Sequence, residues 1–161
     1  MTAIASHAGQ NRVAGDGLLH PFALAASATL LLNDMLLKPA FGNWFTGKLS
    51  DVAALVVLAV VIQAVAELAG APIRPRVLAA ALVASGVALI AIKLLPPAGE
   101  LYRWGLGAAQ WVPGAAAALF DRNPMPDVIP VALTRDATDL VTLPILMVAW
   151  FLFRERVDFE R

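Results

Sequence analysis

The chain has 161 residues, no formal net charge, no cysteine and two histidines, His7 and His20. Its residues are 60% hydrophobic and only 15% charged, whereas soluble domains average about 45–50% apolar and about 25% charged. This composition indicates an integral membrane protein, because a soluble domain of this length has no interior for such an apolar excess. The missing cysteines exclude disulfides and thiolate chemistry. The neutral charge and scarce histidines argue against nucleic-acid binding and a histidine metal site.

The first 17 residues, MTAIASHAGQNRVAGDG, are mostly small or polar. We predict that residues 1–17 form a disordered N-terminal tail. Residues 18–154 are then a single transmembrane domain, and residues 155–161 a short cytoplasmic tail.

Four stretches are long and apolar enough to cross a bilayer, which takes about 20 mostly apolar residues. They are apolar around most of the helix circumference, unlike the one-sided stripe of a surface helix. Glu67, close to the end of the second of these stretches (residues 52–69), is expected to be solvated. The four stretches cover residues 21–37, 52–69, 77–95 and 137–153. The sequence therefore predicts an all-α, polytopic membrane helical bundle.

Residues 101–120 are also long enough to cross, but they contain Arg103 and Gln110. Trp104 and Trp111 are seven residues apart and share a helix face, and tryptophan favours the membrane–water interface. We predict an interfacial or re-entrant helix here. A fifth crossing is the alternative.

The orientation depends on where the basic residues lie. With four crossings the termini share a side, and the basic residues divide evenly between the two sides. Arg74 and Arg76 occupy a short loop, and Arg154 and Arg156 directly follow the last span, which favours the cytoplasm for that side. With five crossings the C-terminus again falls on the more basic side. We therefore expect a bacterial cytoplasmic-membrane protein with a cytoplasmic C-terminus, whereas the side of the N-terminus depends on the number of crossings.

Two segments of the chain resemble each other. Thr46-Gly-Lys-Leu-Ser-Asp-Val-Ala-Ala-Leu opens the second span, and Thr134-Arg-Asp-Ala-Thr-Asp-Leu-Val-Thr-Leu opens the fourth. The shared Thr, Ser/Thr, Asp and Leu positions favour two similar helical hairpins with one orientation, and coincidence is the alternative. Both Ser/Thr-Asp pairs would also suit helix capping.

This arrangement gathers polar side chains at the extracytoplasmic end of the bundle. Asp34 lies within its span, where a charge costs about 2.5–3.5 kcal/mol near the centre and usually pairs with another group. Lys38 is one helical turn away, and Lys93 can reach the same level by snorkelling. We therefore expect both lysines to neutralise Asp34. The predicted polar cluster comprises Asn33, Asp34, Lys38, Trp44, Lys48, Ser50, Asp51, Lys93, Arg135, Asp136 and Asp139.

The cluster has two interpretations. It is either a salt-bridge network that locks the helices together or a pocket that binds a ligand. Its four carboxylates face three lysines and one arginine, and such a balance of signs suits a zwitterionic or polar molecule, including a lipid head group. Trp44, with Phe41 and Phe45 beside it, would form the aromatic rim.

Two motifs in the cluster resemble those of VanZ-type bacterial membrane proteins. Lys48-Leu-Ser-Asp51 follows a short aromatic loop, and Arg135-Asp136-Ala-Thr-Asp139-Leu140 precedes the last span. The resemblance implies a few-span bundle with charged motifs opening two helices, and some members of that family are linked to glycopeptide resistance at the outer membrane face. The histidine that the family carries near its lysine motif is absent here.

The sequence contains no Ser/His, His/Glu or glycine-rich phosphate motif. We therefore expect a non-enzymatic protein without cofactor or metal, which binds a lipid head group or another polar or zwitterionic molecule. The alternatives are an accessory or assembly subunit of a larger membrane complex, a small transporter that works as an oligomer, and an enzyme with an Asp34–Asp139 dyad. The expected partners are the bilayer and either a lipid-linked ligand or another membrane subunit, with homo-oligomers allowed and nucleic acid excluded.

Overall fold

The computed structural model describes residues 13–157, and every regular element within them is helical. This confirms the predicted all-α fold class. Elements η1 and η3 are 3-10 helices, and η2 is a stretch of π-helix. In chain order the elements are η1 (Asp16–Leu19), α1 (Pro21–Leu32), η2 (Asn33–Leu37), α2 (Lys38–Phe41), α3 (Trp44–Leu68), α4 (Pro75–Leu94), α5 (Pro96–Asp121), η3 (Ala137–Thr142) and α6 (Ile145–Val157).

Three segments of the described chain are long and apolar enough to cross a membrane: α3, α4 and the combined segment Ala137–Glu155. They correspond to the second, third and fourth predicted spans and indicate a membrane protein. The first predicted span, residues 21–37, is helical throughout. It consists of α1 followed by the π-helical η2, and it is not one of the three long apolar segments.

The segment before α1 packs against the end of α3. The backbone N–H of Gly15 donates to Oε2 of Glu67 over 2.9 Å, and the Glu67 Oε1 accepts from Nε2 of Gln63 over 2.8 Å. Glu67 is buried, so the expectation that it is solvated was wrong, because the N-terminal segment covers it. Of the predicted tail, residues 1–12 lie outside the described chain, and residues 13–17 already lead into η1.

Helix α1 runs antiparallel to α3. Its N-terminal side begins beside the end of α3, where Gly15 contacts Glu67, and the side chain of Asn33 contacts Thr46 near the start of α3. The ring of His20 caps α1, since its Nδ1 accepts from the N–H of Phe22 over 3.2 Å. Asn33 opens the π-helical turn, and such turns are frequent at functional sites.

Helix α3 begins at Trp44, earlier than the predicted residue 52, because Asn43 and Thr46 form a capping box. The Asn43 side chain accepts from the N–H of Thr46 over 3.0 Å, and the Thr46 hydroxyl accepts from the N–H of Asn43 over 3.1 Å. This arrangement satisfies two N–H groups that a helix start leaves unpaired. Ser50 and Asp51 therefore lie inside the helix, and the expectation that Ser50 caps it was wrong.

Close contacts of small residues join α3, α4 and α6. The hydroxyl of Ser85 donates to the carbonyl of Leu55 over 2.9 Å. A Cβ atom at Gly86 would lie 3.0 Å from Cδ1 of Leu146, so the absence of a side chain there lets α6 approach α4. Such small-residue packing is typical of membrane helices. The core between these helices and α1 includes Val56, Val60, Leu78, Leu82 and Phe153.

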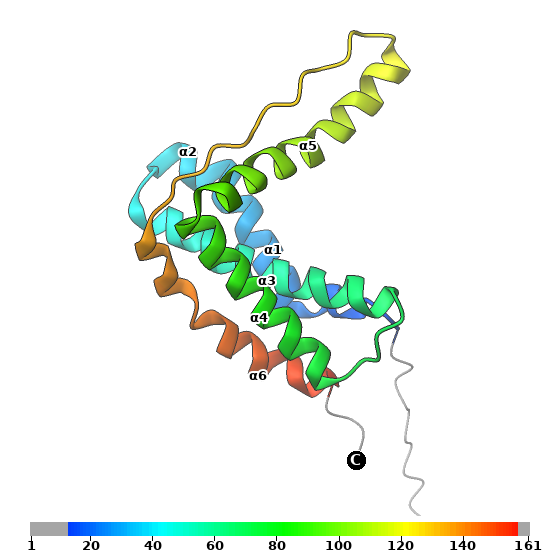
Figure 1. Ribbon diagram of the computed structural model, residues 1–161, viewed down its shortest axis with the longest axis vertical. Helices are drawn as coiled ribbons and strands as arrows, with labels where there is room; N and C mark the ends of the chain where they lie inside the picture. Colours follow the sequence, from blue (N-terminus) through cyan, green and yellow to red (C-terminus); the bar gives the residue numbers. More distant parts are fainter. Residues whose placement is uncertain (1–12, 158–161) are drawn as a thin grey trace, which may run out of the picture.

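Helix α5 and the extended segment 123–136 that returns from it form an arm, which projects away from the other helices (Figure 1). Two hydrogen bonds join Arg103 and Val131, each 3.1 Å long. The Nε–H of Arg103 donates to the carbonyl of Val131, and the backbone N–H of Val131 donates to the carbonyl of Arg103. A Cβ atom at Gly107 would lie 2.3 Å from the carbonyl oxygen of Ile129, so the returning segment lies directly on the glycine. The predicted 101–120 helix is present, and its interfacial position stays a prediction.

The last predicted span bends at Pro144. The 3-10 helix η3 ends at Thr142 and α6 begins at Ile145, and Pro144 lacks the N–H that an uninterrupted helix would use. Helix α6 continues to Val157, so the first residues of the predicted cytoplasmic tail are helical. Residues 158–161 lie outside the described chain.

Candidate functional site

The predicted polar residues lie where α3 and η3 begin and α4 ends, and the structure divides most of them into two groups. The first, here called the Asp139 group, joins three separate helical segments. The second, here called the Asn33 group, joins η2 and α2 to α3. The Asp139 group contains Lys48, Asp51, Lys93, Asp136 and Asp139, and the Asn33 group contains Asn33, Asp34, Lys38 and Ser50.

Asp139 is the centre of its group. The ammonium of Lys48 pairs with Oδ1 of Asp139, and the ammonium of Lys93 pairs with Oδ2. All three side chains are nearly buried, with 8–9% of their surface exposed. One carboxylate therefore holds α3, α4 and η3 together, and both cations are neutralised, as buried charges must be.

Lys93 has two further partners. Its Nζ lies 3.5 Å from Oδ1 of Asp51 and donates to the carbonyl of Thr134 over 3.2 Å. A cation near the C-terminus of α4 is also favoured by the helix dipole. We had expected Lys93 to neutralise Asp34, and this was wrong, because α4 packs against η3 and brings Lys93 to Asp139 instead.

Asp136 caps η3 at the rim of the group. It accepts from the hydroxyl of Thr138 over 2.7 Å and from the N–H of Thr138 over 2.8 Å. These bonds, together with the Lys48 ammonium 3.6 Å away, hold the pKa of Asp136 below its usual value. Asp136 is therefore ionised at neutral pH, and its side chain is 42% exposed.

The Asn33 group is a chain of hydrogen bonds from the bundle interior to its surface. The fully buried Asn33 donates from Nδ2 to the carbonyl of Thr46 over 2.7 Å and to the hydroxyl of Ser50 over 2.6 Å. Ser50 donates in turn to Asp34 over 2.7 Å, and Lys38 pairs with the same Asp34 oxygen over 2.7 Å. Asp34 and Lys38 are nearly half exposed, so the pair lies at the surface of the protein.

The Asp34–Asp139 dyad of the enzymatic alternative does not form. Asp34 is paired with Lys38 and Ser50, whereas Asp139 is paired with Lys48 and Lys93. Their carboxylates therefore belong to separate groups and share no contact that would let one proton serve both.

Two predicted residues stand apart from the ion pairs. Trp44 is largely exposed, and its ring centroid lies 5.4 Å from the Lys48 ammonium, a cation–π distance. Arg135 is exposed and forms no ion pair with the described residues. The Asp139 group thus contains three carboxylates and two ammonium groups, so the predicted balance of four against four does not apply to it.

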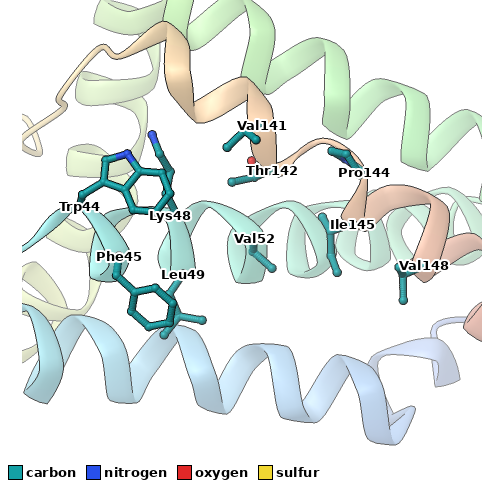
Figure 2. Close-up of a pocket in the computed structure, with 10 residues that line it drawn as sticks. All are labelled: Trp44, Phe45, Lys48, Leu49, Val52, Val141, Thr142, Pro144, Ile145 and Val148. Atoms are coloured by element: carbon teal, nitrogen blue, oxygen red, sulfur yellow. The ribbon is translucent and has the colours of Figure 1, made fainter.

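An apolar groove of about 420 Å³ leads to this site, between α3 on one side and η3 and α6 on the other (Figure 2). Lys48 is its charged residue and lies beside Trp44 at one end, while Val148 lies toward the other. The remaining lining residues are Phe45, Leu49, Val52, Val141, Thr142, Pro144 and Ile145. The break in helical structure around Pro144 shapes one wall of the groove.

A second, smaller cavity of about 100 Å³ lies between α3, α4 and the start of α5. Its polar lining comes from Asp51, Lys93, Ser85 and Tyr102. A cavity of this size with several polar groups is large enough for water. The Asp51–Lys93 pair therefore borders a cavity that is large enough to hold water.

Several site residues were missed by the sequence analysis. Thr138 was considered only as a helix cap, yet its hydroxyl accepts from Lys48 over 2.8 Å and donates to Asp136. The similarity between Thr46–Leu55 and Thr134–Leu143 already marked this position as equivalent to Ser50. The groove residues Val52, Ile145 and Val148 carried no signal, because an apolar residue in a membrane helix looks the same whether it faces lipid or a groove.

Within residues 13–157 no group of three or more His, Cys, Asp or Glu side chains is suited to a metal ion. The site places cations and anions at one end of an apolar groove. Comparison with protein-family models, with curated proteins and with solved structures found no match for the chain. The resemblance to VanZ-type proteins stays a prediction.

Proposed function

We propose that this is a multi-pass protein of the bacterial cytoplasmic membrane that binds a single lipid molecule. The acyl chain lies in the groove between α3 and α6, and the head group lies at the Trp44–Lys48 end. The observation that carries this proposal is the groove itself, because about 420 Å³ falls within the usual range of ligand pockets, about 300–1,000 Å³. Its apolar walls and its one charged end match the two parts of a lipid.

The head end favours a zwitterionic head group. The indole N–H of Trp44 lies at the groove end that Lys48 also lines, has no hydrogen bond within the described chain, and suits a phosphate. The exposed, ionised carboxylate of Asp136 lies 3.6 Å from Lys48 and suits an ammonium. A purely anionic head group would meet this carboxylate as a like charge.

The proposal includes four crossings with a cytoplasmic C-terminus. Its support is the packing of α1 along α3, since Gly15 lies at one end of α3 and Asn33 near the other. If α3 crosses the bilayer, residues 21–37 run the same distance beside it in the opposite direction. The proposal also includes two similar hairpins, α1–α3 and α4–α6.

A second candidate is an accessory subunit of a larger membrane complex. It is favoured by the exposure of two of the apolar segments, since only 28% of the most apolar stretch of α4 and 22% of that of Ala137–Glu155 are buried. A partner helix could cover these faces in place of lipid. Native purification followed by mass spectrometry separates the two candidates, because only the second requires a copurifying protein.

The lipid proposal is tested by filling the groove. Val52→Trp places an indole among the groove residues, whereas Val83→Trp, on the exposed face of α4, does not touch them. Native mass spectrometry of the purified variants should show the bound lipid lost from Val52→Trp and kept by Val83→Trp. Equal lipid content in both variants would contradict the proposal.

Asp136→Asn tests the class of head group. The wild type and the variant are each offered phosphatidylethanolamine and phosphatidylglycerol together. If the carboxylate binds an ammonium, the variant should retain less phosphatidylethanolamine than the wild type, and its relative phosphatidylglycerol content should rise. An unchanged ratio of the two lipids would show that Asp136 does not contact the head group.

A further inference from the structure

The arm formed by α5 and segment 123–136 has two unlike faces. Arg103, Gly107 and Trp111, spaced four residues apart, face the returning segment and contact it. Gln110 and Asp121, seven and eighteen residues after Arg103, lie on this same side of the helix. Glu100 also joins this side, since it pairs with Arg103 over 3.0 Å. The charged residues of α5 and Gln110 therefore lie on the covered side.

The opposite side of α5 is apolar and uncovered. It carries no charged residue, and its large side chains are each more than half exposed: Leu101, Trp104, Val112 and Leu119. Phe120, beside this face, is 89% exposed. A contiguous apolar surface of this kind marks an interaction site.

The position of the arm relates this face to the membrane. Helix α5 begins at Pro96, immediately after the apolar helix α4 ends at Leu94. The arm therefore starts at the level where α4 leaves the hydrocarbon. Figure 1 shows the returning segment on the side of α5 that points away from α3 and α4, so the apolar face of α5 points back toward the level of the bilayer.

We propose that the arm is a membrane-surface anchor that lies flat on the leaflet next to the Asp139 group. The apolar face of α5 enters the boundary between head groups and acyl chains, and the returning segment covers its polar side toward water. Amphipathic helices lie in this boundary with their apolar face about 5–10 Å deep, and Trp104 supplies the ring that favours it. This inference does not depend on the lipid-binding proposal, because the arm shares no residue with the groove.

The depth of Trp104 tests the proposal in the full-length protein reconstituted in phosphatidylcholine vesicles. In a variant with Trp104 as the sole tryptophan, bromines near the top of the acyl chains should quench its fluorescence more strongly than bromines near the chain ends, and acrylamide should quench it weakly. Val112→Glu, on the apolar face, should abolish the bromolipid quenching. The matched change Gln110→Glu, on the covered face, should preserve it.

Other outcomes overturn the proposal. Strong acrylamide quenching with no bromolipid quenching would place the face in water. Protection from both quenchers would place it against a second copy or another protein. Single cysteines at Gln110 and Asn123 should react with a membrane-impermeant maleimide from the same side as a cysteine at Ala40, and labelling from the other side would show that α5 crosses the membrane.

Discussion

Asp139 is the residue on which the packing of three helical segments depends. Asp139→Asn leaves the nearly buried ammonium groups of Lys48 and Lys93 without their shared partner, and breaking such a pair typically costs about 3–5 kcal/mol. We expect this variant to lose stability on that scale in reversible SDS unfolding. Asp136→Asn, on a more exposed side chain, should lose much less stability, because exposed ion pairs contribute little. Similar losses for the two variants would contradict a central role for Asp139.

The partner of Lys93 can be identified by a double-mutant cycle. Lys93→Met and Asp139→Asn should be coupled by about 0.5–3 kcal/mol, because their side chains are in contact. Lys93→Met and Asp34→Asn share no contact, so their effects should add within about 0.5 kcal/mol. Strong coupling of Lys93 to Asp34 would indicate that these two side chains pair, as the sequence suggested, and would contradict the packing of α4 against η3.

The pH dependence of Asp136 follows from its bonds to Thr138. Because its folded pKa is lowered, the stabilisation by Asp136 is present above its ordinary pKa of about 3.9 and is lost as the pH falls through the folded value. Thr138→Val removes the hydroxyl bond and should raise the pKa of Asp136 toward its ordinary value. Carbon-detected NMR titration of the Asp136 carboxyl measures this shift, and an unchanged pKa would show that the hydroxyl does not contribute.

The sequence was sufficient to predict the local Asp34–Lys38 pair and the charged residues that share one end of the bundle, but not the ion pairs between separate helices. Lys48, Asp51, Lys93 and Asp139 lie near helix ends, so the span boundaries alone bring them to one level. Their pairing depends on how each helix is rotated about its axis, and helices that are apolar all round carry no stripe that fixes this rotation. The start of α3 was missed for a different reason: the capping box of Asn43 and Thr46 lies in the short aromatic loop before the apolar run, and hydropathy alone does not recognise a helix cap.

At the scale of the element, Gly107 determines how closely the returning segment packs on α5. Gly107→Ala would place a Cβ atom 2.3 Å from the Ile129 carbonyl oxygen, so the segment must move away and its bonds to Arg103 should weaken. We expect faster hydrogen exchange at the N–H of Val131. Gly105→Ala is the matched control, because nothing lies within 4 Å of its Cβ position.

The control also has an expected direction of its own. Alanine replaces glycine inside a helix with a gain of roughly 0.5–1 kcal/mol, so Gly105→Ala should leave the exchange at Val131 unchanged or slower. If both alanine variants speed the exchange equally, the arm is sensitive to any change in α5 and the close approach at Gly107 is not the cause.

At the scale of the whole molecule, the antiparallel packing of α1 on α3 makes the number of crossings testable from the ends of these two helices. The chain has no cysteine, so single cysteines can be labelled without background. With four crossings, Leu19→Cys before α1 and Pro72→Cys after α3 should be protected from an impermeant maleimide in intact spheroplasts, whereas Ala40→Cys between the helices should react. All three should react after solubilisation, which controls for local burial. Reaction of Leu19→Cys and Ala40→Cys from the same side would show that α1 does not cross the bilayer. A reactive Pro72→Cys with a protected Ala40→Cys would show that the protein has the opposite orientation in the membrane with the same fold.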